Sequence, residues 1–258
     1  MRDKVGRVAK NLIKLLPIVS IAAFFLFWQY FSGFYSVTLF PSPLQVLTAL
    51  FELIERGVLA EHITVSILRY LAGYILAVIF AVPLGIMFGY YPLFHFAVDP
   101  LIQVLRPISP IAWFPLAVLW FGIGNAPAVF IIFLASFFPL LLSTLDSVRQ
   151  IPPIYFKVAA NFGAGKGAVF YKVILPAAFP GIMVGLHIAV GTAWIHLVAG
   201  EMLGSQSGLG YLIVDSRNFL RTDWIIAGML TVGIIGLVIY RIMQMFEIFI
   251  KRFWGVES

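Results

Sequence analysis

The feature that most limits how this chain can fold is a series of long apolar stretches that carry almost no charge. A membrane-spanning helix needs about 20 consecutive apolar residues. Six stretches come close to this length: residues 15–34, 65–90, 98–121, 128–145, 177–203 and 224–250. They are continuous, whereas the strands of a membrane β-barrel alternate in hydrophobicity. The sequence therefore predicts an all-α fold, a polytopic membrane helical bundle of about six transmembrane helices.

Composition and charge agree with a membrane protein. Charged residues make up 11% of the 258 residues and hydrophobic residues 62%, whereas soluble domains are about a quarter charged. The net charge of +6 does not indicate a nucleic-acid partner, because many basic residues flank the apolar stretches: Arg2, Lys4, Arg7, Lys10 and Lys14 before the first, and Lys251 and Arg252 after the last. This placement follows the positive-inside rule and predicts that both termini are cytoplasmic.

The sequence carries no motif for catalysis or for a resident cofactor. It has no cysteine, which excludes disulfides, thiolate metal sites and cysteine nucleophiles. It has no GxxxxGK[ST] phosphate loop, no HExxH motif and no recognisable Ser-His-Asp set. We therefore expect a chain that is not an enzyme and that binds neither a cofactor nor a metal.

The chain is predicted to have three regions. Residues 1–60 hold a basic segment, the first span and an amphipathic helix at 44–61 that lies on the outer membrane surface. Residues 61–250 form the main transmembrane domain, and 251–258 a short tail. Within the main domain we expect a tight outer turn at 122–127, a cytoplasmic loop at 150–176 and a polar outer loop at 204–223.

Prolines and glycines predict how some spans are shaped. The third span contains Arg106 together with Pro107, Pro110 and Pro115, and so many prolines predict a broken helix. Two glycine pairs, 85 with 89 and 181 with 185, have the small-xxx-small spacing that lets transmembrane helices approach closely.

The loop at 150–176 is the longest polar and basic interruption of the apolar sequence. Pro152 and Pro153 suit the start of a helix, and the glycines at 163 and 165 suit its end. A second helical piece with Lys166 and Lys172 then leads to Pro176. Such a helix-elbow-helix at the membrane surface is a handle that another protein could push. The alternative is an ordinary basic loop between two spans.

This loop resembles the coupling loop of the permease subunits of ABC importers. Their signature is Glu-Ala-Ala, three residues, Gly, nine residues, Ile, one residue, Leu-Pro. Aligned on Gly163, the chain has Val173, Leu175 and Pro176 at the expected distances, but Lys157 replaces the signature Glu. The resemblance implies contact with an ATPase through seven residues: Lys157, Val158, Ala159, Ala160, Gly163, Ala164 and Pro176.

A wider resemblance runs from about residue 62 to the sixth span. The segments SILRYLAGYILAVIFAVPLGIMFG, LRPISPIAWFPLAVLWFGIG and AGEMLGSQSGLGYLIVDSRNFLRTD are similar to permeases for taurine and aliphatic sulfonates, a family that also includes nitrate and bicarbonate permeases. SGLGYLI followed by NFLRTD favours the sulfonate members. Nitrate, bicarbonate or a thiamine-precursor pyrimidine remain alternative substrates.

The resemblance implies a type I ABC importer transmembrane domain in the inner membrane of a prokaryotic cell. It implies a homodimer in membrane lipid, two ATP-binding cassette subunits on the cytoplasmic face and an external substrate-binding protein. ATP and Mg²⁺ would be bound by the partner ATPase. No nucleic acid is expected as a partner.

Three charged residues are candidates for the translocation path or a gate. Glu201 ends an apolar span, where a carboxylate usually faces a cavity or a partner; it would form an outer gate, pair with a buried basic residue, or lie solvated at headgroup level. Arg106 could guide an anion, because a guanidinium matches a sulfonate, or snorkel to headgroups. Arg69 could attract anions or anchor its helix, and anchoring is favoured.

The remaining candidates are histidines and aromatics. His187 and His196 lie nine residues apart and hence on different faces of a helix, which predicts hydrogen bonds inside the bundle rather than a shared metal site. Trp194 could line a ligand cavity together with Trp113, Trp120 and Trp224, although packing is the usual role of such aromatics.

Two other classes of function have less support in the sequence. An ion-coupled secondary carrier would need several acids at mid-membrane, and the spans contain few. An intramembrane enzyme lacks any set of residues that could form its site.

Overall fold

The computed structural model describes the backbone of residues 2–253 and the side chains of residues 16–250. The described chain is helical and contains no strand. Its helices are α1 (Arg2–Ser32), α2 (Pro43–Glu55), α3 (Val58–Tyr90), α4 (Pro92–Leu105), α5 (Phe114–Phe121), α6 (Asn125–Arg149), α7 (Pro153–Asn161), α8 (Lys166–Val169), α9 (Leu175–Gly204), α10 (Leu209–Asn218) and α11 (Thr222–Phe253). Two short segments, η1 (Pro110–Trp113) and η2 (Phe170–Ile174), are 3₁₀ and π helices respectively.

The chain divides into two compact units. One consists of residues 1–60 and 212–230, and the other of residues 61–211 and 231–258. Helices α3, α10 and α11 each contribute residues to both units. The basic side chains before residue 15 and the predicted tail 251–258 lie outside the residues whose side chains are described.

In the first unit, the amphipathic helix α2 is shorter than predicted. Ser42 and Gln45 form a capping box at its start, with Pro43 as its first residue. The helix ends at Glu55, Gly57 adopts a positive φ of 73°, and α3 begins at Val58. The predicted helix at 44–61 and the predicted span start at 65 were therefore wrong, because Gly57 provides the left-handed residue that commonly ends a helix.

A charged cluster joins α2 to the start of α11. The Arg221 Nη2 group donates to Glu52 Oε2 at 2.6 Å and to Asp223 Oδ2 at 2.8 Å. The Trp224 Nε1–H also donates to Glu52, at 3.1 Å, and the Arg221 guanidinium lies 4.5 Å from the Trp224 ring centroid. The hydrogen bonds from Arg221 and Trp224 hold the pKa of the Glu52 carboxyl below its usual value. The hydrogen bond to Asp223 raises the pKa of Arg221.

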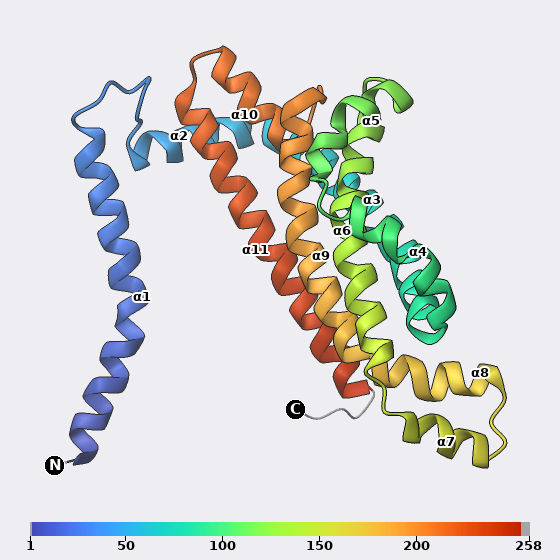
Figure 1. Cartoon of the computed structure of the whole chain (residues 1–258). Coiled ribbons are helices and arrows are strands. Elements are labelled where there is room, and N and C mark those ends of the chain that lie inside the picture. The colour runs from blue at the N-terminus through green and yellow to red at the C-terminus, as the bar shows by residue number, and fades with distance from the viewer. Residues whose placement is uncertain (1, 254–258) are drawn as a thin grey trace. The chain divides into compact units, whose positions relative to one another are not determined.

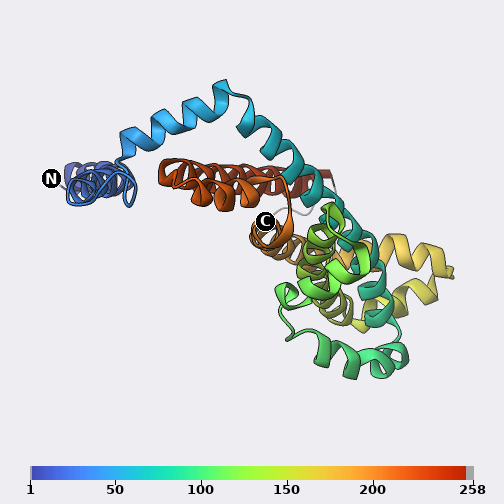
Figure 2. The same ribbon diagram turned by 90° about the horizontal axis from the view of Figure 1, so that it is seen from above.

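The second unit is built around α6, which packs between α3 and α9. In both views α6 and α9 lie next to each other (Figures 1 and 2). A Cβ added at Gly85 of α3 would lie 2.7 Å from Thr144 Cβ and 2.8 Å from Leu141 O, both on α6. On α9, a Cβ at Gly185 would lie 2.7 Å from Ser143 Cβ. Both predicted small-xxx-small faces therefore contact the same helix.

We expect Gly85→Leu to lower the free energy of unfolding by about 1–3 kcal/mol, the usual cost of inserting carbon atoms into a tight contact. Gly191→Leu is a matched control, because no atom lies within 4 Å of the Cβ position at this exposed α9 glycine. Thermal unfolding in detergent, followed by tryptophan fluorescence, measures both. An equal loss in the two variants would show that the α3–α6 contact is not tight.

The third predicted span is a broken helix, as the prolines indicated. Helices α4 and α5 are joined through η1 and bent by 86°. Pro110 begins η1, and Pro115 occupies the first turn of α5, where the missing N–H groups cost nothing. The turn that follows is shorter than the predicted 122–127, because α6 begins at Asn125 after two glycines with positive φ, Gly122 and Gly124.

Among the residues that the structure describes, four helices are long and apolar enough to cross a membrane: Val58–Tyr90, Asn125–Arg149, Lys166–Gly204 and Thr222–Ile250. The bent pair α4 and α5 would make a fifth. The first predicted span corresponds to α1, whose apolar part, Leu16–Ser32, is shorter than the other four. The predicted polar loop at 204–223 contains a helix that was not expected, α10.

Candidate functional site

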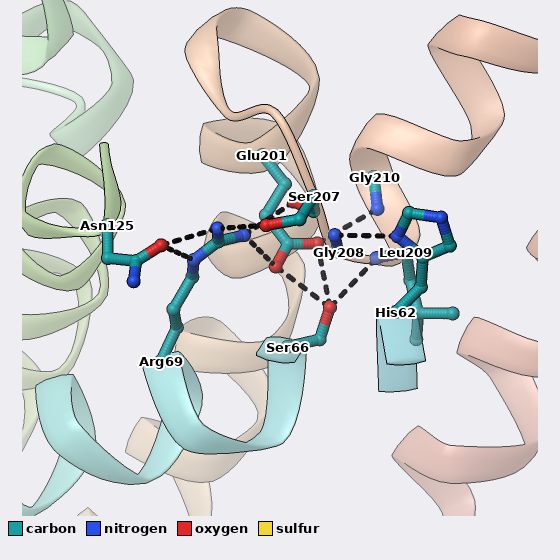
Figure 3. A network of polar contacts seen from close by, with 9 residues as sticks. All are labelled: His62, Ser66, Arg69, Asn125, Glu201, Ser207, Gly208, Leu209 and Gly210. Carbon is teal, nitrogen blue, oxygen red and sulfur yellow. Dashed lines mark hydrogen bonds and ion pairs between the residues drawn. The ribbon is translucent and has the colours of Figure 1, made fainter. Parts of the chain in front are cut away.

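A buried ion pair joins α3 to the last turn of α9. Glu201 is 1% exposed and Arg69 4% exposed, and Arg69 Nη1 donates to Glu201 Oε1 at 2.9 Å (Figure 3). The Ser66 hydroxyl lies 2.8 and 2.9 Å from the two carboxylate oxygens. The Gly210 N–H donates to Oε2 at 2.9 Å. Glu201 is therefore paired and hydrogen-bonded, which is the condition under which a charge can be buried.

Arg69 uses all of its donors within the protein. Its Nε and Nη2 groups donate to Asn125 Oδ1 at 2.9 and 2.6 Å. Nη1 donates to the Ser207 carbonyl at 2.6 Å as well as to Glu201, and Nη2 donates to the Ser207 hydroxyl at 2.8 Å. A guanidinium has five N–H donors, and five hydrogen bonds account for them. In this arrangement Arg69 anchors its helix and has no donor left for an anion.

The same network holds the segment between α9 and α10. Gly208, with φ of 103°, donates its N–H to His62 Nδ1 at 2.9 Å, and the Leu209 N–H donates to Ser66 Oγ at 2.8 Å. A Cβ at Gly208 would collide with the Glu201 carboxylate, so the chain passes directly over this group. The Gly210 N–H, in the first turn of α10, donates to the Glu201 carboxylate, and a negative charge at this place stabilises a helix N-terminus.

A large cavity lies among α5, α6, α9 and the connection from α4. Its volume is about 720 Å³. Most of the lining is apolar and aromatic, including Trp113 and Trp120. The ionisable lining residues are Arg106, Asp146 and His196. A smaller pocket of about 300 Å³ shares Arg106 and Asp146 with it and also contains Arg149. Among residues 16–250 the Arg106 guanidinium makes no hydrogen bond or ion pair.

Of the remaining predicted path residues, His196 lines this cavity, whereas Trp194 and His187 do not. Trp194 donates its Nε1–H to the Val232 carbonyl at 3.1 Å and is 8% exposed. His187 lies with Nδ1 3.4 Å from Glu247 Oε2 on α11. His196 lies on the cavity wall, with Nδ1 2.8 Å from the Thr192 carbonyl. Within residues 16–250, no group of three or more His, Asp or Glu side chains could hold a metal ion.

The segment from α7 to α8 turns away from the ends of α6 and α9 (Figure 1). Pro153 is the first residue of α7, and the helix ends before Gly163, which has φ of 67°. The Gly163 N–H donates to Ala160 O, and the Ala164 N–H donates to Ala159 O. The predicted elbow is therefore present. The second helical piece begins at Lys166, contains Lys172 in η2, and continues into α9, which has Pro176 in its first turn, as predicted.

Of the seven elbow residues, Ala159 is buried and Ala164 and Pro176 are half-buried, while Lys157, Val158, Ala160 and Gly163 are exposed. This surface is accessible to another protein. Sequence reasoning identified the elbow but missed Ser66, Asn125, Ser207 and His62 of the buried network. His62 and Ser66 precede Arg69 on α3 by seven and three residues, a spacing that places all three on one face of the helix. Asn125 and Ser207 come from distant parts of the chain, and no spacing indicates that they reach this face.

The fold and these sites define a polytopic helical membrane protein. The exposed elbow at Gly163 precedes α9, and the buried network around Glu201 and Arg69 lies at the last turn of the same helix. The chain belongs to the family of binding-protein-dependent transport system inner membrane components, whose model matches residues 81–252. It is thus a permease subunit of an ABC importer, a non-catalytic membrane component.

Individual relatives agree with this assignment. The taurine transport system permease protein TauC of Escherichia coli K12 is 36% identical over 76% of this chain and 73% of its own length. SsuC of Bacillus subtilis 168, named for aliphatic sulfonates transport, is 35% identical over 92% of this chain and 86% of its own length. The bicarbonate transport system permease protein CmpB of Synechococcus elongatus is 34% identical over 92% and 90%.

A solved structure of the methionine ABC transporter MetNI, in inward-facing conformations, contains a chain with the same fold. The TM-score is 0.54 at 17% identity, over 74% of this chain and 95% of that chain.

Proposed function

We propose that this permease subunit forms the translocation path for a small organic sulfonate, with taurine as the preferred substrate. The main support for this proposal is the cavity of about 720 Å³. Its lining is mostly apolar and includes the guanidinium of Arg106 and the carboxylate of Asp146. The relatives named for taurine and for aliphatic sulfonates support the same substrate class.

The charges of the cavity fit the chemistry of this substrate. A sulfonate matches a guanidinium through paired N–H donors, and Arg106 has free donors. Taurine also carries an ammonium group, which would donate hydrogen bonds to a carboxylate such as that of Asp146. Arg106 and Asp146 give the cavity one guanidinium and one carboxylate, and a zwitterion suits such a pair better than a simple anion. The apolar wall suits the short hydrocarbon part of the substrate.

Two variants separate these roles. Arg106→Gln is expected to lower uptake of both taurine and an alkanesulfonate at least tenfold, because a hydrogen bond to a charged group is worth about 1.5–3 kcal/mol. Asp146→Asn is expected to lower taurine uptake while leaving the alkanesulfonate unchanged. Initial uptake rates at limiting substrate measure both. Arg149→Gln is the control, because Arg149 lines only the smaller pocket; a loss as large as that of Arg106→Gln would contradict the assignment.

The α7–α8 end is proposed to face the cytoplasm. Residues 150–176 contain three lysines and no acid, which supports this orientation by the positive-inside rule. We propose that two copies of the chain form a homodimer, with an ATPase docked at each elbow and an external binding protein at the opposite end. The ATPases would bind ATP and Mg²⁺, and their closure would move the elbow and rock α6 and α9.

Reconstitution tests the whole proposal. The permease is placed in proteoliposomes with its cognate ATPase and binding protein, and ATP-dependent accumulation of taurine, an alkanesulfonate, nitrate and bicarbonate is measured. Taurine is expected to accumulate most. Bicarbonate is the second candidate, because CmpB is nearly as similar as the sulfonate relatives. Accumulation of bicarbonate alone would overturn the sulfonate proposal, and uptake without ATP would contradict the importer mechanism.

A further inference from the structure

A second cavity lies where α3 ends and the α8–η2 segment begins. It has a volume of about 390 Å³, and its wall includes Pro83, Ile86 and Met87 of α3 and Phe170 and Ile174 of η2. This size is within the range of ligand-binding pockets. We call this second cavity the groove. It is separate from the cavity that contains Arg106, since the two share no lining residue.

The position of the groove decides what can enter it. Its walls belong to Val58–Tyr90 and Lys166–Gly204, which are both long and apolar enough to cross a membrane. Tyr90 and Tyr91 at its edge are 39% and 46% exposed, and tyrosines are enriched at membrane interfaces. An apolar groove at the end of two such helices meets acyl chains on one side and headgroups on the other.

The charge of the groove is one-sided. Lys166 is its only ionisable wall residue besides the tyrosines, and this exposed lysine forms no hydrogen bond or ion pair with residues 16–250. Lys157 and Lys172 lie on the same loop, and residues 150–176 contain no acid to balance them. Basic pockets between transmembrane helices at one membrane face bind anionic lipid headgroups.

We propose that this groove binds an anionic phospholipid, with an acyl chain against Met87 and Phe170 and the phosphate at Lys166. The bound lipid would contact α3 and η2 together. Because η2 is a π segment between α8 and α9, and such segments are frequent at functional sites, the lipid would steady the connection between the elbow and α9. The proposal does not depend on which substrate the permease carries.

Lipid binding to the purified chain tests the proposal without any transport assay. Native mass spectrometry in detergent would measure binding of phosphatidylglycerol and of phosphatidylcholine with the same acyl chains. Phosphatidylglycerol is expected to bind more tightly. Lys166→Gln should weaken it about fivefold, the factor that corresponds to about 1 kcal/mol per basic residue near an anionic surface. Lys172→Gln, which removes the same charge outside the groove wall, should change binding less than twofold.

A second pair of variants tests the apolar part. Met87→Trp fills the groove and should reduce binding of phosphatidylglycerol, whereas Met229→Trp, at an exposed position of α11, should not. Equal binding of the two lipids, or equal effects of the two lysine variants, would overturn the proposal. Displacement of the lipid by glycerol phosphate at the same concentration would also overturn it, because a soluble phosphate would then be the ligand.

Discussion

Replacing Glu201 by alanine is expected to lower the free energy of unfolding by about 3–5 kcal/mol, because removing one partner leaves the other charge buried and unpaired. Arg69 is 4% exposed and cannot reach solvent without moving the segment that carries Ser207. The Gly210 N–H and the Ser66 hydroxyl lose a partner as well. Thermal or denaturant unfolding in detergent, followed by tryptophan fluorescence, measures the loss.

Two controls make this result specific to the pair. Glu55→Ala removes the same side chain at an exposed position of α2 and should change stability by less than about 0.5 kcal/mol. The single variants Arg69→Met and Glu201→Met should each lower the free energy of unfolding. The double variant that combines them should lower it by less than the sum of these two changes, because neither charge is left buried without a partner. Additive losses would show that the two side chains do not act as a pair.

Gly163→Val is expected to abolish ATP-dependent transport while the chain still inserts into the membrane. The φ of 67° at Gly163 is in the left-handed region, which costs an ordinary L-residue about 1–2 kcal/mol and a β-branched residue more. No atom lies within 4 Å of the Cβ position, so the effect comes from the backbone alone. A valine would push the elbow toward another conformation and displace α7 relative to α8. Uptake in proteoliposomes with the partner ATPase measures this.

Two neighbouring substitutions separate conformation from bulk. Gly163→Asn should retain most of the transport, since asparagine tolerates the left-handed region. Gly165→Val adds the same side chain two residues away, where φ is −68° and no atom lies within 4 Å, and should be close to wild type. If Gly165→Val were as damaging as Gly163→Val, bulk on the surface of the loop would be the cause. Full transport in Gly163→Val would show that the elbow does not transmit force.

Local features of the chain could be predicted where short-range physics decides them. The start of α7 at Pro153, the elbow at Gly163 and the break between α4 and α5 follow from the backbone limits of proline and glycine. Helix α10 was not predicted, because its sequence is too polar to be read as part of a span. The carboxylate that accepts a hydrogen bond from its first turn belongs to Glu201, nine residues before Gly210, so no local capping motif marks where the helix begins.

The sequence by itself determined a helical membrane protein, the positions of most spans and the surface elbow, because chain length, hydrophobicity and the special backbones of Gly and Pro act locally. Only the tertiary structure decided which polar residues meet. Arg69 and Glu201 are 132 residues apart, and their partners Ser66 and Asn125 come from separate helices. The reason is physical: a buried charge must find every hydrogen-bond partner it needs in space, and helix packing, not sequence spacing, brings those partners together.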